Sequence, residues 1–224
     1  MTAFSGMGAM RIESGTSVSR LHVLVPGAES LDAVDYVLEA GASLDLTLLV
    51  MPGVSCDVPL SVELVGEGAS ASLTGLYICP DEEKVDISVR LRHNLPGCVS
   101  RQLFKGVAGG RSRVVFDGRI IVVQDAQKTE AYQENHNLLL STDARVDTRP
   151  QLEIYADDVK CSHGATVGSL NEDEQFYMRS RGISLEEARA LQIISFLSPV
   201  LDSIGDEAKR QSCRDMVEAA LKGL

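Results

Sequence analysis

The sequence predicts a mainly β body followed by a small C-terminal helical domain. Short runs with strand-like composition recur from about residue 18 to residue 166, separated by Gly, Pro, Asp and Asn. One of these segments has a second copy 27 residues further along the chain. Helix-capping patterns begin only after Gly168. We therefore expect a flexible N-terminus over residues 1–16, a β body over 17–168 and a helical domain over 169–224.

The expected strands are rich in aliphatic and β-branched residues. Hydrophobic residues make up 44% of the chain, but aromatic residues only 4% and Trp is absent, so Val, Leu, Ile and Ala must build the core. Only Leu31–Leu38 has a helix-like pattern between the strands, which disfavours a parallel sheet with helical crossovers. The expected strands are Leu21–Val25, Leu44–Val50, Ser61–Val65, Ala71–Ile78, Val85–Leu91, Arg113–Phe116, Arg119–Val123 and Gln151–Ala156.

The repeated segment favours a stacked architecture. Gly41–Thr47 reads GASLDLT and Gly68–Thr74 reads GASASLT, which are identical at five of seven positions. A turn and strand that recur suit a solenoid, in which each coil buries its apolar face on the next. A β-sandwich also contains many short strands. The residue pattern alone leaves both architectures open.

Two capping patterns mark the expected helices. Asn171 precedes Glu174 by three residues, and Ser184 precedes Glu187 by the same spacing. Gly182 is a suitable stop for the first helix. The second helix has its apolar stripe at Leu185, Ala188, Leu191, Ile194 and Leu197.

Pro199 is expected to bend or end the second helix. A third helix is expected near Asp206–Lys222, with Ala208, Cys213, Met216, Val217 and Ala220 on one stripe. The helices could cap the open end of the β body, or they could present an apolar face to a partner. Periodicity does not separate these alternatives.

Charge and composition exclude several classes of function. The formal net charge is -11, so the surface repels phosphates, and nucleic acids and anionic membranes are poor partners. The longest apolar runs, such as Leu44–Met51, are too short to span a bilayer. Met1–Met10 lacks the features of a signal peptide. The five cysteines include no CxxC pair, which is typical of reduced thiols, and we expect a cytoplasmic protein.

No enzyme motif is present in the sequence. GxSxG, HExxH and Walker A patterns are absent, and Gly106–Gly110 lacks the Lys-Ser/Thr of a phosphate loop. Asp157 and Asp158 are adjacent, so on an extended chain they would point to opposite faces and make a poor acid–base pair. We therefore expect a protein that is not an enzyme.

The segment that follows carries candidate metal ligands. If Val159–His163 is extended, then Cys161 and His163 share one face with Val159. A thiolate and an imidazole could both bind iron, although such residues on a strand usually serve packing. His136 also lies beside ligand-capable residues. Because two ligands do not complete a metal site, others must come from elsewhere in the chain or from a second subunit.

Several segments together resemble the SufB/SufD family. The most specific is PQLEIYADDVKCSHGATVG, and the resemblance runs from about His93 to the C-terminus, whereas the first 90 residues agree only in general character. We expect a compact form of the family, because the sequence shows no counterpart of the N-terminal helical region that is common in it. The matching segments are Pro150–Gly168, Phe176–Ile183, Glu187–Arg189, Ser100–Val107, Phe116–Ile120 and Asn137–Leu140.

The resemblance implies a right-handed parallel β-helix followed by the helical domain. It implies a non-catalytic scaffold for iron–sulfur cluster assembly that docks through its C-terminal helices on a SufC-like ABC ATPase. The β-helices of two family members pair edge to edge. A cluster would form transiently at that interface and would not be bound permanently.

Individual positions resemble the D-type (SufD-like) members. His163 matches the interface histidine of the D-type, while Asn135 and Gly164 stand where the B-type has a cysteine and a glutamate. The partner is then a SufB-like paralogue. The alternative is a self-sufficient homodimeric scaffold with His163, Cys161 and His136 as ligands. Two other hypotheses remain: a β-solenoid enzyme that acts on sugars, and an interaction subunit that does not contact the metal.

Overall fold

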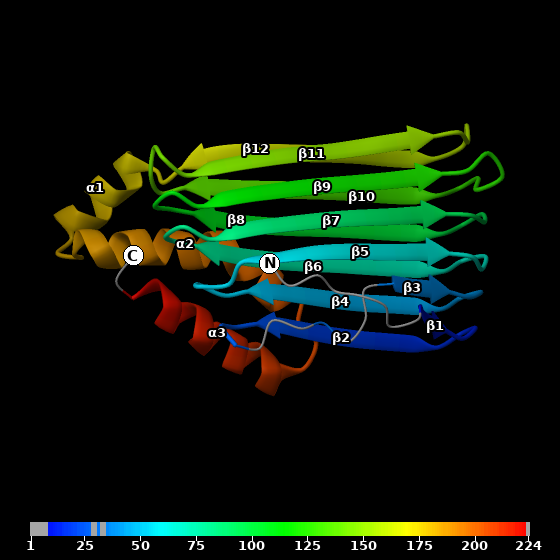
Figure 1. Cartoon of the computed structure of the whole chain (residues 1–224), viewed down its shortest axis with the longest axis horizontal. Coiled ribbons are helices and arrows are strands. Elements are labelled where there is room, and N and C mark those ends of the chain that lie inside the picture. Colours follow the sequence, from blue (N-terminus) through cyan, green and yellow to red (C-terminus); the bar gives the residue numbers. More distant parts are fainter. Residues whose placement is uncertain (1–8, 28–30, 32–34, 223–224) are drawn as a thin grey trace.

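The chain forms a parallel β-solenoid of two stacked sheets, followed by three helices (Figure 1). The structure is a computed structural model that describes residues 9–27, 31 and 35–222. Sheet A consists of β1 (Met10–Ile12), β3 (Asp35–Leu38), β5 (Cys56–Leu64), β7 (Lys84–His93), β9 (Arg113–Val122) and β11 (Arg145–Ile154). Sheet B consists of β2 (Ser17–Leu24), β4 (Ser43–Val50), β6 (Ser70–Cys79), β8 (Val99–Ala108), β10 (Glu130–Leu139) and β12 (Lys160–Ser169).

The strands alternate between the two sheets along the chain, so each coil contributes one strand to each sheet. All described strand pairs are parallel. Ser43 of β4 is in register with Ser70 of β6, which is the 27-residue offset of the sequence repeat. The solenoid prediction is thus confirmed, and a β-sandwich, which has antiparallel sheets, is excluded.

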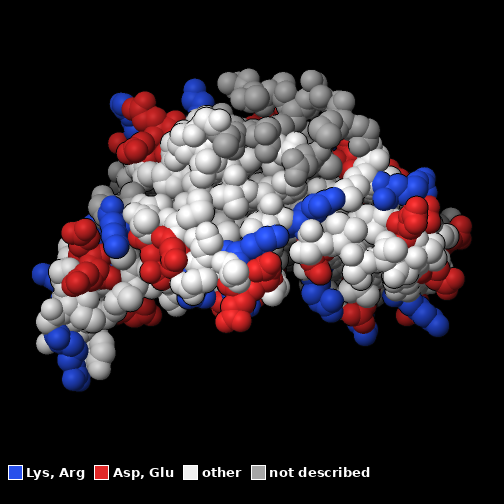
Figure 2. All heavy atoms as spheres, turned by 90° about the horizontal axis from the view of Figure 1, so that it is seen from below, with Lys and Arg blue, Asp and Glu red and all other residues white. Residues whose placement is uncertain are grey.

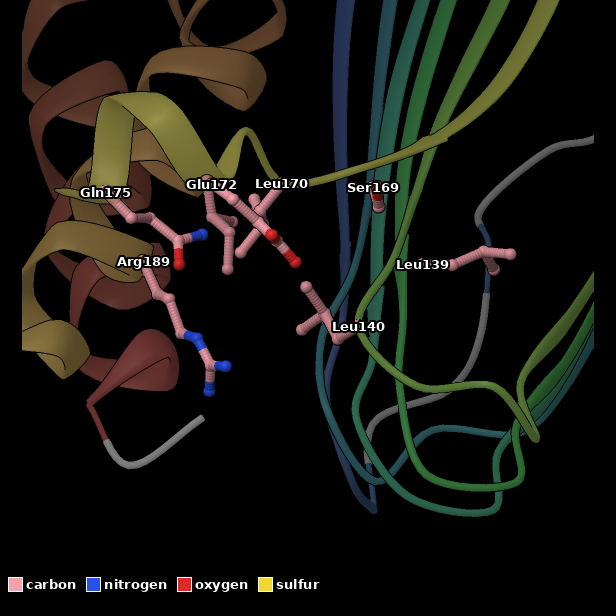
Figure 3. Close-up of a pocket in the computed structure, with 8 residues that line it drawn as sticks. Leu139, Leu140, Ser169, Leu170, Glu172, Gln175 and Arg189 are labelled. Carbon is pink, nitrogen blue, oxygen red and sulfur yellow. The ribbon is translucent and has the colours of Figure 1, made fainter.

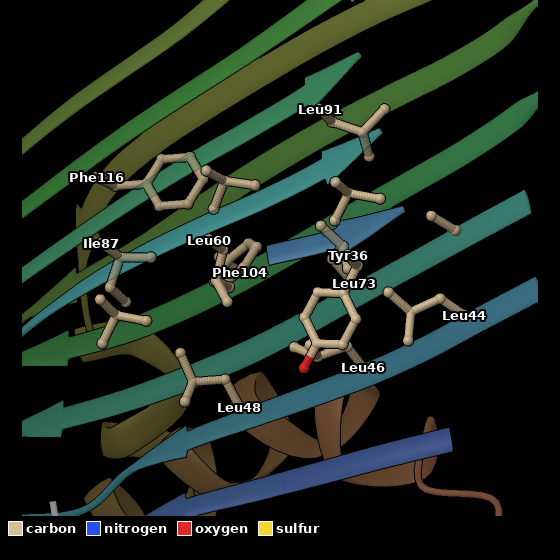
Figure 4. Close-up of a cluster of buried hydrophobic side chains, with 14 of the residues drawn as sticks. Tyr36, Leu44, Leu46, Leu48, Leu60, Leu73, Ile87, Leu91, Phe104 and Phe116 are labelled. Carbon is tan, nitrogen blue, oxygen red and sulfur yellow. The ribbon is translucent and has the colours of Figure 1, made fainter. Parts of the chain in front are cut away.

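Aliphatic side chains fill the space between the sheets in the first coils (Figure 4). Leu46 and Leu73 are in register on neighbouring strands of sheet B, and both are fully buried. Phe104 from sheet B meets Phe116 from sheet A with ring centroids 5.0 Å apart. Gly75 leaves the room for this pair, because a Cβ there would lie 2.5 Å from the Phe104 ring.

The interior becomes polar in the last coils. Asn135 and Asn137 of β10 are buried on the interior face, together with the hydroxyl of Tyr77. The side-chain nitrogen of Asn135 donates a hydrogen bond to that hydroxyl at 3.2 Å, and the hydroxyl donates to the side-chain oxygen of Asn137. Burial raises the pKa of Tyr77, which keeps the hydroxyl protonated. These hydrogen bonds allow polar residues at positions where β4 has the apolar residues Leu48 and Val50.

The N-terminal part differs from the sequence prediction in two places. β1 lies within residues 1–16, which were expected to be loose, because Ile12 is buried and pairs with Leu38 of β3. The helix pattern at Leu31–Leu38 is wrong for its last four residues, which form β3 with Tyr36 and Leu38 in the core. Residues 1–8 and 32–34 of these two segments lie outside the described residues.

Strands β8 and β10 were not predicted, because polar residues occupy their interior positions and break the expected alternation. The two short strands expected at Arg113–Phe116 and Arg119–Val123 form one strand, β9. Gly118 lies in its middle because the Gln133 side chain packs on it. A Cβ at Gly118 would be 2.4 Å from the Gln133 amide nitrogen.

The helices begin where the capping patterns predicted. They are α1 (Glu172–Ser180), α2 (Leu185–Asp202) and α3 (Glu207–Leu221). The Asn171 side chain accepts hydrogen bonds from the backbone of Asp173 and Glu174. Ser184 and Glu187 form a capping box. Both caps satisfy amides that have no partner inside the helix.

Helices α2 and α3 pack on the outer face of sheet B. Pro199 lies inside α2 and does not end it, because Val200 and Leu201 of the last turn are buried against the sheet and α3. Leu185 and Leu191, expected on the buried stripe, are 37% and 49% exposed. The buried apolar cluster between sheet B and these helices contains Leu49, Met51, Leu76, Ile78, Val107, Ile193, Leu197, Val200, Leu201, Ile204, Cys213, Val217 and Leu221.

The molecular surface mixes charges of both signs. Figure 2 shows acidic and basic side chains interspersed on the face seen from below. No helix within the described residues is both long and apolar enough to cross a membrane.

Candidate functional site

The candidate site lies at the last coil of the solenoid. β12 is hydrogen-bonded to β10, and β11 to β9, and each is the final strand of its sheet within the described residues. Their outer backbone edges therefore face no further strand of the described chain (Figure 1). Such edges are suited to pairing with another chain.

Cys161 and His163 both lie on the interior side of β12. They are in register with Ala131 and Gln133 of β10, which are buried between the sheets. Because no described coil covers β12, His163 is exposed and Cys161 half-buried. The prediction that Cys161 and His163 share one face is therefore consistent with the register of the sheet.

His136 lies on the opposite, outer face of sheet B. It is in register with Thr166, whose Oγ1 is 2.8 Å from the His136 Nδ1 atom. Its Nε2 atom is 3.2 Å from a carboxylate oxygen of Glu134. The structure thus does not bring His136 together with Cys161 and His163, because residues 163 and 166 of one strand point to opposite faces.

The outer-face neighbours of His136 include a lysine in a partly apolar setting. Lys105 of β8 is in register with His136 and lies over the Phe196 ring of α2, with its Nζ atom 4.4 Å from the ring centroid. Burial lowers the pKa of Lys105, and the Glu134 carboxylate opposes that effect. This cation–π contact helps fasten α2 to sheet B.

The donor set at the open end suits iron but is incomplete. An imidazole and a thiol are both iron ligands. Burial raises the pKa of Cys161, so its thiol is less readily converted to the thiolate that binds metal. Within the described part of the chain, no three His, Cys, Asp or Glu residues lie close enough to hold a metal. Any metal held by His163 needs ligands from beyond this set.

Sequence reasoning missed a row of buried amides beside His163. Gln102 of β8 and Gln133 of β10 are in register, and Gln133 is in turn in register with His163. The side-chain nitrogen of Gln133, Nε2, donates to the side-chain oxygen of Gln102, Oε1, at 2.8 Å. The available signal was the spacing of Gln133, Asn135 and Asn137, which places all three on one face of a strand.

A cleft separates the helices from the ends of β10 and β12. Its volume is about 250 Å³, and Figure 3 shows Glu172, Gln175 and Arg189 on its helical side and Leu140 on its strand side. The residues between β12 and α1 are Leu170 and Asn171. The N-terminus of α1 is therefore tied closely to the strand that carries His163.

Helix α1 projects from the body with exposed aromatic side chains. Phe176 is 74% exposed and Tyr177 is 60% exposed. The buried residue of α1 is Gln175, which donates a hydrogen bond to Gln192 of α2 at 3.0 Å. Exposed aromatic residues of this kind are typical of protein-binding surfaces.

A groove runs along α2 beside the end of α3. It has a volume of about 570 Å³. Its apolar lining includes Ile183, Leu191, Ile194 and Leu221, and Glu186 and Glu218 also contribute to it. Together with α1, this groove gives the helical region an extended, partly apolar surface.

Comparisons with known proteins agree with this architecture. Residues 13–196 match the family described as "SUF system FeS cluster assembly, SufBD core domain". The chain is 42% identical over 163 residues to the iron–sulfur cluster assembly protein SufD of Escherichia coli (strain K12), a match that covers 73% of this chain and 38% of the relative. It is 40% identical over 161 residues to the chloroplastic protein ABCI7 of Arabidopsis thaliana, covering 71% of this chain and 34% of the relative.

A third relative is an iron–sulfur cluster assembly SufBD family protein of Synechocystis sp., which is 41% identical over 138 residues, covering 62% of this chain and 30% of the relative. The chain thus spans well under half of the length of these curated relatives. The family match covers most of the β-solenoid and extends into α2. On the fold and on these matches together, the chain belongs to the SufB/SufD family of the SUF system for iron–sulfur cluster assembly.

Proposed function

We propose that this chain is a non-catalytic scaffold subunit of a SUF-type complex that assembles iron–sulfur clusters with a SufC-like ABC ATPase. The observation that carries the proposal is the last coil, where His163 faces the open interior beside two strand edges that pair with no further strand of the described residues. Family membership supports the same role. The cluster is the cargo of such a complex, held transiently while it is built.

The open coil pairs with the β-solenoid of a second subunit in this proposal. The edges of β11 and β12 supply backbone hydrogen bonds, and the second solenoid covers the polar interior at that end. His163, with Cys161 beside it, meets ligands from the partner at the junction. His136 is not among these ligands, since it lies on the outer face of sheet B.

Residues 169–224 are the proposed docking domain for the ATPase. Phe176 and Tyr177 of α1 and the groove along α2 form the contact surface. The remaining helical residues are less available, because α2 and α3 bury their apolar faces on sheet B. The first role considered from the sequence, a cap on the open end of the β body, does not describe these helices, since they pack on the outer face of sheet B. The second role, contact with a partner, is the one proposed.

The link between α1 and β12 suggests how the ATPase acts on the cluster site. ATP-driven movement of the ATPase pulls on α1, which continues into β12 through Leu170 and Asn171. The cleft between the helices and the strand ends leaves room for that movement. A shift of β12 moves His163 and opens the junction. The chain itself hydrolyses nothing in this scheme.

Co-purification tests the proposal. The chain is expressed with a SufC-like ATPase, with and without a B-type paralogue, and each product is treated anaerobically with iron and sulfide. A ternary complex that alone takes up a cluster supports the D-type scaffold role. If the chain does not bind the ATPase, the proposal fails. If the chain pairs with itself and holds a cluster unaided, the homodimeric scaffold replaces the D-type role.

A further inference from the structure

Gln133 carries a buried hydrogen-bond acceptor that is not used. The residue has no exposed surface, and its Oε1 atom has no hydrogen-bond partner among the described residues. An unpaired buried polar atom destabilises a protein, so the Gln133 oxygen is expected to bond a donor, either a water molecule or a side chain that moves within reach.

The position of this acceptor is fixed from two sides. The Gln133 amide nitrogen donates to Gln102 of β8 at 2.8 Å. The side chain also lies against Gly118 of the opposite sheet, where a Cβ would leave no room for it. Strands β8 and β12 flank β10, so the Gln133 side chain, whose amide nitrogen is held by Gln102 on the β8 side, has β12 as its other neighbouring strand.

His163 is the residue of β12 in register with Gln133, on the same interior side. Neighbouring strands are about 4.8 Å apart, a spacing across which an imidazole and a side-chain amide in register can form a hydrogen bond. In a neutral imidazole one nitrogen donates and the other is free to accept or to bind a metal.

We propose that Gln133 is a positioning residue for His163: its Oε1 atom accepts the N–H of one ring nitrogen, sets the tautomer and leaves the other nitrogen directed out of the open coil. The relevance for a cluster rests on the proposed function, whereas the hydrogen bond itself needs no metal. Metal-binding histidines usually donate their second nitrogen to an oxygen acceptor in this way. An uncharged amide can do so in an interior where an ionised carboxylate would be costly.

Nuclear magnetic resonance of the metal-free chain tests this hydrogen bond. The histidines are labelled with ¹⁵N, and the His163 signals are identified by their loss in His163→Asn. At a pH where the ring is neutral, the nitrogen shifts give the ratio of the two tautomers. Gln133→Met removes the acceptor at similar volume, and we expect the ratio to change about fivefold, the effect of one ordinary hydrogen bond.

Two further variants separate positioning from a general effect on the fold. Thr148→Val removes another buried oxygen that has no partner within the described chain, and it should leave the tautomer ratio unchanged. If Gln133→Met does not fold, Gln133→Asn withdraws the oxygen by one carbon and should give the same change. An unchanged ratio in the folded variant would overturn the inference, with water then the partner of Gln133.

The outcomes distinguish this inference from the proposed function. If the tautomer depends on Gln133 but His163→Ala leaves cluster uptake by the complex intact, the positioning role stands and the ligand role of His163 fails. If His163→Ala abolishes cluster uptake but Gln133→Met leaves the tautomer ratio of His163 unchanged, the ligand role stands and the positioning role fails.

Discussion

His163 and His136 lie on opposite faces of the same sheet, although they belong to hydrogen-bonded neighbouring strands. His163 faces the solenoid interior in register with Gln133, and His136 faces outward in register with Thr166. Within one chain, sheet B therefore lies between these two side chains. This arrangement leaves Cys161 and His163 as the pair of candidate ligands in the last coil.

The open edge of sheet B is expected to control association with a second solenoid. Val167 of β12 is 45% exposed and lies on the interior side, in register with Asn137. Val167→Lys would place a charge in the junction and weaken pairing, by about tenfold or more in dissociation constant, while leaving the fold intact. Sedimentation velocity with the partner subunit measures the effect.

Ser19→Lys is the matched control for this change, because Ser19 is an exposed residue of β2, the strand at the other end of sheet B, and receives the same charge. Equal weakening by both variants would contradict pairing through the last coil.

Phe176 is expected to be a main contact for the ATPase. Its side chain is 74% exposed in this structure, so Phe176→Ser should not affect stability. Loss of a central aromatic contact costs about 2 kcal/mol, or roughly a 30-fold weaker complex. Calorimetric titration with the ATPase checks this value. Leu95→Ser, at an exposed leucine between β7 and β8, is the control and should bind the ATPase normally. Unchanged ATPase binding by Phe176→Ser would contradict docking through α1.

His93 is expected to make the protein sensitive to acid. Its side chain is fully buried, and burial lowers its pKa from 6.5 to about 4. The unfolded chain therefore binds more protons than the folded chain between these values, and stability falls as the pH drops through this window. At pH 5 the loss relative to pH 7.5 is about 2 kcal/mol from this residue.

Urea unfolding of wild type and His93→Gln at both pH values tests this expectation. The variant is less stable at pH 7.5 because the contact between His93 Nε2 and Ser100 Oγ, 2.9 Å long, is altered. It should lose less stability on acidification than wild type. An equal loss in both proteins would show that other groups cause the acid sensitivity.

The Tyr77 hydroxyl is expected to stabilise the polar interior. It bridges Asn135 and Asn137. Tyr77→Phe leaves buried amide atoms without this partner and should lower the free energy of unfolding by about 1–3 kcal/mol. Thermal and urea unfolding measure the change. Tyr155→Phe, at a tyrosine that is 62% exposed, should be neutral, and a neutral Tyr77→Phe would contradict the bridging role.

Local patterns predicted the parts of the fold that local chemistry decides. The caps at Asn171 and Ser184 lie within three residues of the amides they bind, so the helix starts could be read directly. The aliphatic strands β4 and β6 were found for the same reason. Strand β10 was missed because Gln133 and Asn135 are acceptable in the interior only through partners on other coils.

Long-range contacts explain the remaining differences. Pro199 fits inside α2 because burial of the following residues offsets the hydrogen bond that proline cannot donate. The strand period predicted that Cys161 and His163 share a face. The face of His136 depends on the register between β10 and β12, which the sequence pattern does not determine.

The most direct test of the scaffold proposal compares two histidine variants in the assembled complex. Complexes that contain the wild-type chain, His163→Ala or His136→Ala are treated anaerobically with iron and sulfide, and bound cluster is measured by absorption and iron content. We predict that His163→Ala lowers cluster uptake by about tenfold or more, as expected for loss of a ligand, while His136→Ala retains it. Normal uptake by His163→Ala, with loss in His136→Ala, would contradict the placement of the cluster at the open coil.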